Sequence, residues 1–200
     1  MELPAKSRRA LLLVDLQNDF LHPDGAYGRA GVTATAIAAL PARLAPLAAA
    51  VRGAGGLVIS THFTLVPGRG GAPLIAPHLK ALRRFLGPGD FAPGSWGHAL
   101  VEELAPADAS VEKIAYSAFY MTRLEWLLRK LDVAHLYVAG IVTNGGVAST
   151  ARDAHVRDLG LTIVSDGCAA FSEAVHDATL ASLGSLARTI TTADAVAEFT

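Results

Sequence analysis

Short apolar runs alternate along the chain with segments whose apolar residues recur at helical spacing. The runs with the length of strands cover residues 10–14, 57–61, 111–114, 136–141, 161–164 and 189–191. The helical spacing predicts helices over 35–52, 78–86, 122–131, 146–158 and 172–186, with a short one at the C-terminus. Strands that alternate with helices form a parallel sheet covered on both faces. Right-handed crossovers then bring the carboxyl end of every strand to one edge of that sheet.

Two of these helices carry signals for where they begin. Thr122 and Glu125 have the spacing of a capping box, which predicts that a helix opens there. Pro41 and Pro46 fall inside the expected helix 35–52 and are expected to start or kink it.

The segment from 64 to 110 departs from this alternation. It is rich in proline and glycine and has one expected helix, 78–86. A long irregular segment is usually functional, for example a lid or a pocket wall. A linker is the alternative, but Phe85, Phe91 and Trp96 favour the lid because linkers rarely carry so many aromatic residues.

Composition narrows the class of protein. Hydrophobic residues make up 52% of the 200 residues and charged ones 18%, which predicts one globular domain over residues 1–200. The net charge is −1 with no basic stripe, so neither nucleic acid nor an anionic membrane is an expected partner. Cys168 is the only cysteine, and the apolar run 10–14 is too short for a signal segment. We therefore expect a cytoplasmic protein.

Two charged residues stand at strand ends on the shared edge. Asp15 follows the buried run 10–14, where loss of water raises the pKa of a carboxyl and a nearby cation lowers it. It could equally cap the turn formed by residues 17–19. Lys113 ends the third run and could pair with Asp15 and stabilise an anion, although an exposed lysine is the commoner outcome.

The pair Gly145 and Gly146 follows the strand expected at 136–141. Consecutive backbone N–H groups there could form an oxyanion cradle, helped by the start of the next helix. The conformational freedom of glycine is the alternative explanation. Thr143 and Ser149 are typical of helix caps rather than nucleophiles, since no histidine lies beside them in the sequence.

Neither a metal site nor a cofactor is expected. The seven histidines show no pair at i, i+4 spacing, although His62 lies at the shared edge. Cys168 has no basic neighbour in the sequence that would favour a thiolate, so it is interpreted as a packed small residue.

Three segments taken together, 14–20, 112–119 and 140–154, strongly resemble the isochorismatase-like hydrolase superfamily. Its cysteine hydrolases include nicotinamidases and the N-carbamoylsarcosine and ureidoacrylate amidohydrolases. The resemblance implies a three-layer α/β/α fold of Rossmann-like type with a six-stranded parallel sheet. It also implies a small-molecule substrate and assembly as a homodimer or homotetramer.

The resemblance also assigns roles to single residues. Asp15 and Lys113 match two members of the Asp–Lys–Cys triad of the family's amidases, and the cysteine position falls on Gly146. The family's oxyanion site uses backbone N–H groups that correspond to Val142 and Gly146, after a cis peptide between Ile141 and Val142. A glycine cannot form an acyl-enzyme, so the usual amidase mechanism is not available.

True isochorismatases also have glycine at this position. Their resemblance implies that Asp15 protonates the methylene of an enol ether, after which water adds, while Lys113 holds substrate oxygens. These isochorismatases carry Tyr-Ala-His where this chain has residues 142–144, a stretch that resembles the amidase branch. The residues expected to bind substrate beside these are Phe20, Trp96, Tyr116, Phe119, Asn144 and Gly145.

Three hypotheses follow for the activity. The first is a cysteine-independent hydrolase with Asp15 as general acid or base. The second is a non-catalytic binding protein that keeps the pocket. The third is a C–N hydrolase altered at position 146.

Overall fold

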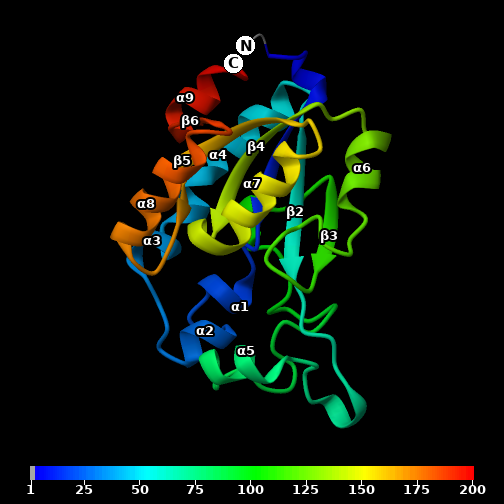
Figure 1. Ribbon diagram of the computed structural model, residues 1–200, viewed down its shortest axis with the longest axis vertical. Coiled ribbons are helices and arrows are strands. Elements are labelled where there is room, and N and C mark those ends of the chain that lie inside the picture. The colour runs from blue at the N-terminus through cyan, green and yellow to red at the C-terminus, as the bar shows by residue number, and fades with distance from the viewer. Residues whose placement is uncertain (1–2) are drawn as a thin grey trace.

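A six-stranded sheet forms the centre of the computed structural model, which describes residues 3–200 (Figure 1). Its strands are β1 (Arg9–Val14), β2 (Leu57–Phe63), β3 (Ala109–Lys113), β4 (His135–Ile141), β5 (Gly160–Ala169) and β6 (Arg188–Ile190). They lie in the order β3-β2-β1-β4-β5-β6, and every neighbouring pair is parallel. The predicted fold is therefore confirmed. The strand order reverses between β1 and β4, and ligands of open α/β sheets bind beyond the strand ends at such a point.

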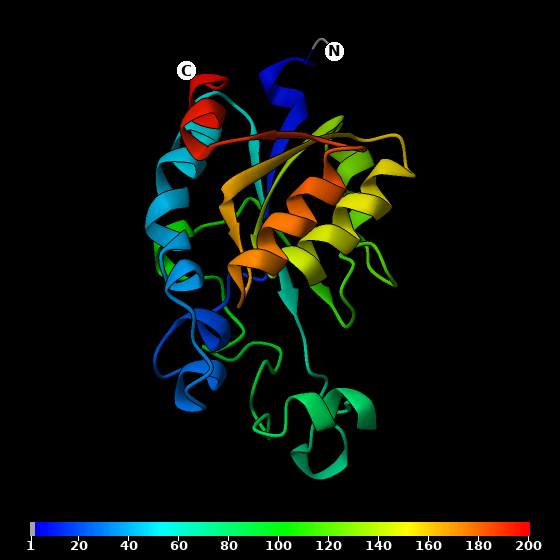
Figure 2. The same cartoon turned by 60° about the vertical axis from the view of Figure 1, so that its left-hand side comes forward.

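Helices cover both faces of the sheet (Figure 2). The helices on one face are α3 (Thr35–Ala38), α4 (Leu40–Gly53) and α9 (Thr192–Ala197). Those on the other are α6 (Leu124–Lys130), α7 (Ala148–His155) and α8 (Glu173–Leu183). The alternation of side chains along β1 supplies both layers: Leu11 and Leu13 pack on the α4 side, and Leu12 and Val14 on the α7 side.

The segment Thr35–Gly53 is long and apolar enough, with a mean hydropathy of 1.2, to cross a membrane by length and composition alone. Its apolar residues Leu40, Leu44, Leu47 and Val51 are completely buried against the sheet. The expected single helix is divided, because α3 ends at Ala38 and Pro41 lies in the first turn of α4.

Two local predictions are wrong. Helix α6 begins at Leu124, two residues after Thr122, and the hydroxyl of Thr122 accepts a hydrogen bond from the N–H of Leu124 at 3.1 Å. Glu125 pairs with Arg129 and Arg157 instead of completing a capping box, because these cations lie within its reach. The helix expected from Gly146 is preceded by a π-helical turn, Thr143–Val147, and α7 itself begins at Ala148.

The first part of the irregular segment, with α5 (Pro77–Leu82), lies beyond the carboxyl ends of the strands, on the same side of the sheet as α1 (Asn18–Leu21) and α2 (Ala26–Arg29) (Figure 1). Its last part runs back along α4 to the start of β3, and Val101 and Leu104 are buried there. Short 3₁₀-helical turns of three residues each cover Lys6–Arg8, Arg69–Gly71 and Glu102–Leu104 in the described part of the chain. A small apolar cluster joins the segment to α2, with Tyr27, Leu65, Leu86 and Phe91 buried. This cluster contradicts the linker alternative and makes the segment a wall of the site described below.

Candidate functional site

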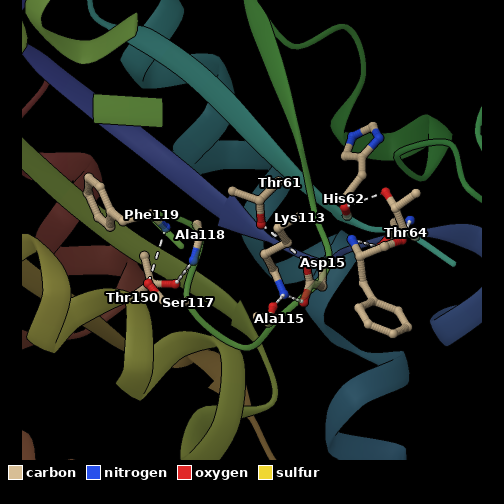
Figure 3. A network of polar contacts seen from close by, with 12 residues as sticks. Asp15, Thr61, His62, Thr64, Lys113, Ala115, Ser117, Ala118, Phe119 and Thr150 are labelled. Atoms are coloured by element: carbon tan, nitrogen blue, oxygen red, sulfur yellow. Dashed lines mark hydrogen bonds and ion pairs between the residues drawn. The ribbon is translucent and has the colours of Figure 1, made fainter. Parts of the chain in front are cut away.

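An ion pair between Asp15 and Lys113 lies at the carboxyl ends of β1 and β3 (Figure 3). The Nζ of Lys113 is 2.6 Å from Oδ2 of Asp15 and donates to the carbonyl of Ala115 at 3.0 Å. On the intervening strand β2, the hydroxyl of Thr61 donates to Oδ1 of Asp15 at 3.1 Å. Asp15 adopts a φ of 57°, a left-handed conformation that aspartate tolerates better than most residues.

Both members of this pair are removed from water, with exposed fractions of 5% for Asp15 and 2% for Lys113. Burial raises the pKa of the Asp15 carboxyl above its usual value of 3.8, and the charge of Lys113 opposes this shift. Lys113 is therefore not the exposed lysine of the alternative interpretation. Among the described residues, the side chains that bond the Asp15 carboxylate are Thr61 and Lys113, not those of the turn 17–19.

The turn after β4 places backbone amides beside this pair. The peptide between Ile141 and Val142 is cis, as the resemblance implies, and the π-helical turn follows it. The N–H of Gly145 donates to the carbonyl of Val142 at 2.9 Å, so this amide is occupied. Within residues 3–200, the N–H groups of Val142 and Gly146 donate to no carbonyl outside their own turn. They are the two amides that the resemblance assigns to an oxyanion site.

The backbone around Gly146 approaches closely. A β-carbon at this position would lie 2.8 Å from the carbonyl oxygen of Ile141, 3.0 Å from Cγ1 of Val14 and 3.3 Å from Oδ2 of Asp15. The first contact is with backbone and is too short for carbon, so a cysteine would fit only if the Ile141 carbonyl moved. This argues against a C–N hydrolase altered by one exchange at position 146.

We expect Gly146→Ala to lower the free energy of unfolding by about 1–3 kcal/mol, as overpacking does in a tightly packed site. Gly145→Ala is the matched control, because its β-carbon would meet side chains of Val142 and Tyr116 at 3.0 Å or more, and these can move. Urea unfolding of both variants measures the difference. Equal losses in the two variants would contradict the close fit at Gly146.

A cavity of about 300 Å³ opens next to the ion pair. Its lining comprises Asp15, Phe20, Tyr27, Phe63, Ile75, His78, Leu79, Arg83, Lys113, Ile114, Ala115, Tyr116, Ile141, Val142, Gly146 and Phe171. The strand ends contribute Asp15, Lys113 and Gly146, and the irregular segment contributes apolar side chains and Arg83. This lining contains no serine, threonine or cysteine, so it offers none of the usual hydroxyl or thiol nucleophiles.

The structure brings most predicted site residues to this cavity. Asp15, Lys113 and Gly146 lie together, and Val142, Phe20 and Tyr116 also line it. The other four residues predicted to bind substrate do not line the cavity: Trp96, Phe119, Asn144 and Gly145.

Each of these four has a different environment. Trp96 is half exposed and packs its indole edge-on to His22. Phe119 is buried in the core on the α7 side, because the chain turns inward there to cover that face of the sheet. Asn144 is exposed on the π-helical turn, and Gly145 uses its amide within that turn.

Several cavity residues were missed in the sequence. Arg83, His78 and Tyr27 lie in the irregular segment or on α2, and only the folded chain shows that they face Asp15. Their one sequence signal is position, since Arg83 falls within the segment expected to form a pocket wall. Phe171 follows β5 and stacks on Tyr27 with ring centroids 6.0 Å apart.

The polar residues after Asp15 fix the wall of the cavity. The carboxylate of Asp19 accepts hydrogen bonds from the N–H of Ala26 at 2.9 Å and of Phe91 at 2.6 Å. The amide of Gln17 bonds the backbone of Phe63 at 2.8 Å through its oxygen and at 3.0 Å through its nitrogen. These side chains therefore support the cavity wall, whereas the sequence alone indicates only a turn at residues 17–19.

Cys168 and His62 do not take part in the site. The thiol of Cys168 is buried on β5 and lies 3.7 Å from the carbonyl of Val138; burial raises its pKa to about 12, which confirms the packed interpretation. His62 bonds the hydroxyl of Ser60 at 2.8 Å, and burial lowers its pKa to about 4. In the described part of the chain, no three histidine, cysteine or acidic side chains gather as metal ligands would.

Comparison with known proteins identifies the family of this chain. The Isochorismatase domain family matches residues 9–195. The chain is 35% identical over 185 residues to the ureidoacrylate amidohydrolase RutB of Methylobacterium radiotolerans, covering 86% of this chain and 72% of that protein. It is 36% identical over 156 residues to the RutB of Pantoea ananatis, covering 72% of this chain and 62% of that protein.

A solved structure shows the same architecture. The cysteine hydrolase from Pseudomonas syringae pv. phaseolicola superposes with a TM-score of 0.81 at 26% identity, covering 100% of this chain and 98% of that one. The family match, the curated relatives and the strand order agree with one another. This chain belongs to the isochorismatase family of hydrolases.

Proposed function

We propose that this protein hydrolyses a small molecule without a covalent enzyme intermediate, with Asp15 moving the proton. One observation carries the proposal: the buried pair of Asp15 and Lys113 borders the same cavity as Gly146. Apart from the phenols of its tyrosines, the lining of this cavity has no hydroxyl or thiol nucleophile. A water molecule then has to attack the substrate directly. The carboxylate of Asp15 borders the cavity where such a water would bind, beside the strand-end amides, and acts as its base.

On an amide or ureide the reaction takes place in two stages. Asp15 takes a proton from water while the water oxygen bonds to the carbonyl carbon and the carbonyl electrons move to oxygen. The N–H groups of Val142 and Gly146 stabilise that oxyanion. The carbonyl then re-forms, the C–N bond breaks, and the proton on Asp15 goes to the leaving nitrogen. Lys113 keeps the carboxylate oriented throughout through its contact of 2.6 Å.

A C–N bond is the first choice of substrate because the curated relatives are named ureidoacrylate amidohydrolases. The chain spans 72% and 62% of those relatives, and it has glycine where the resemblance places their cysteine. An enol ether is the second candidate, since burial raises the pKa of Asp15 and so favours the protonated carboxyl that this reaction needs.

Incubation of the purified protein with a panel of ureides, amides and vinyl ethers tests the proposal. Release of ammonia or amine, or of a ketone from a vinyl ether, at more than one turnover per protein molecule supports it. Saturable binding of panel members by calorimetry without any product would overturn it and favour the binding-protein hypothesis.

The pH profile distinguishes the two roles of Asp15. As a base it must be ionised, so kcat/KM should rise with pH through the pKa of Asp15, which burial places above 3.8. Below that pKa we expect a loss of about tenfold per pH unit. As an acid it must be protonated, and kcat/KM should instead fall with rising pH. A profile that is flat from pH 4 to 8 would contradict both roles.

Assembly as a homodimer or homotetramer and a cytoplasmic location stay predictions.

A further inference from the structure

We propose that Arg83 binds a carboxylate of the substrate, so that the substrate is a small organic anion whose charge lies away from its scissile bond. This inference rests on the proposed function, in that it places the substrate in the same cavity. Arg83 contacts the part of the substrate that is distant from the scissile bond, whereas Asp15 acts at the scissile bond itself.

The first observation is the position of Arg83. It directly follows α5 in the irregular segment, and its side chain lines the cavity. Its Nε donates to the phenol oxygen of Tyr27 at 2.9 Å, and the side chain of Tyr116 lines the same cavity. Tyr27 lies on α2, so this bond holds the guanidinium where the irregular segment meets α2 in the cavity wall.

The second observation is charge. Within residues 3–200, Arg83 forms no ion pair, although it is half buried beside mainly apolar side chains. The one carboxylate that lines the cavity, Asp15, is already paired with Lys113. The cavity therefore has one cation more than it has anions, and a half-buried cation without a counterion is costly unless a ligand supplies one.

The third observation is hydrogen-bonding capacity. A guanidinium has five N–H donors in a planar fork that matches the two oxygens of a carboxylate. The bond to Tyr27 uses one of these donors and leaves the greater part of the fork available. Because the phenol oxygen of Tyr27 accepts from Arg83, its own O–H stays free to donate to the same ligand. Burial raises the pKa of Tyr27 and keeps this donor protonated at neutral pH.

Benzoate and nitrobenzene test the proposal by calorimetric titration. They have nearly the same shape and differ in charge, and neither has a bond that a hydrolase would cleave. We expect the wild-type protein to bind benzoate at least about tenfold more tightly than nitrobenzene, as hydrogen bonds to charged groups predict. Arg83→Met should remove this preference and leave the affinity for nitrobenzene unchanged. Arg83→Lys should keep part of it.

Arg84→Met is the matched control, because it removes the same charge from an exposed neighbour that does not line the cavity. It should keep the preference for benzoate. The proposal is overturned if wild type shows no preference or binds neither probe, or if Arg83→Met keeps the preference. Loss of both probes in Arg83→Met would also overturn it, since Arg83 would then only support the wall.

The test separates this inference from the proposed function. Binding of benzoate needs no turnover, so a protein that prefers benzoate but hydrolyses nothing keeps the anion site and loses the hydrolase proposal. A protein that hydrolyses its substrate through Asp15 but shows no preference for benzoate gives the opposite result.

Discussion

Asp15→Asn is expected to lower kcat/KM for the hydrolysed substrate by about 10²–10⁴-fold, the range that a positioned general acid or base contributes. Asparagine keeps the size of the side chain and tolerates the left-handed backbone at position 15, where φ is 57°. It can neither take a proton from water nor give one to a leaving group. Steady-state kinetics on the best panel substrate measures the effect.

Asp24→Asn is the control for this variant. It makes the same chemical change on an exposed carboxylate that does not line the cavity. Its kinetics should equal those of the wild type. Unchanged turnover in Asp15→Asn, with a folded protein by circular dichroism, would mean that another group moves the proton.

Lys113→Met is expected to lower the free energy of unfolding by about 3–5 kcal/mol, because it leaves a buried carboxylate without its cation. The pKa of Asp15 already lies above 3.8 in the folded protein, and loss of Lys113 moves it higher. The folded state then binds a proton more readily than the unfolded chain. Stability therefore falls as pH rises above 3.8 and reaches its lowest plateau above the folded-state pKa, so acidification should return part of the loss.

Guanidinium unfolding at several pH values measures this loss. Lys130→Met, on the exposed end of α6, is the control for charge and should change stability by less than about 0.5 kcal/mol. The double variant Asp15→Asn with Lys113→Met should recover most of the loss, because it removes both buried charges. A loss below about 1 kcal/mol in Lys113→Met would show that water reaches the pair.

The sequence predicts the fold because the central strands β1 and β4 are nearly continuous apolar runs, and such runs have few alternatives to a buried parallel sheet. The edge strands β3 and β6 are short and partly polar, and their alternation with helices indicates them instead. It also places Asp15 and Lys113 at strand carboxyl ends on one edge, which allows their pairing but leaves open an exposed Lys113 and an Asp15 that caps the next turn. These are consequences of topology. They need no knowledge of side-chain directions.

The residues that were misplaced depend on directions that a sequence does not encode locally. Trp96 and Phe119 are aromatic residues in segments next to the site, yet one faces outward and the other faces the core. Arg83 reaches the cavity only because the irregular segment folds over the strand ends. Contacts of this kind arise from tertiary packing, which hydrophobic periodicity does not describe.

The wall of the cavity has an apolar cluster of its own, around Tyr27, Leu86 and Phe91, distinct from the two cores that hold the sheet. Exchanges within this wall can therefore alter which molecule fits without loosening the frame that holds Asp15 and Lys113. The residues that select the substrate and the residues that carry out the chemistry are therefore held by different apolar clusters. New selectivity should be obtainable by recombining residues 65–91 among relatives, because this stretch contains no strand of the sheet and no member of the two sheet cores.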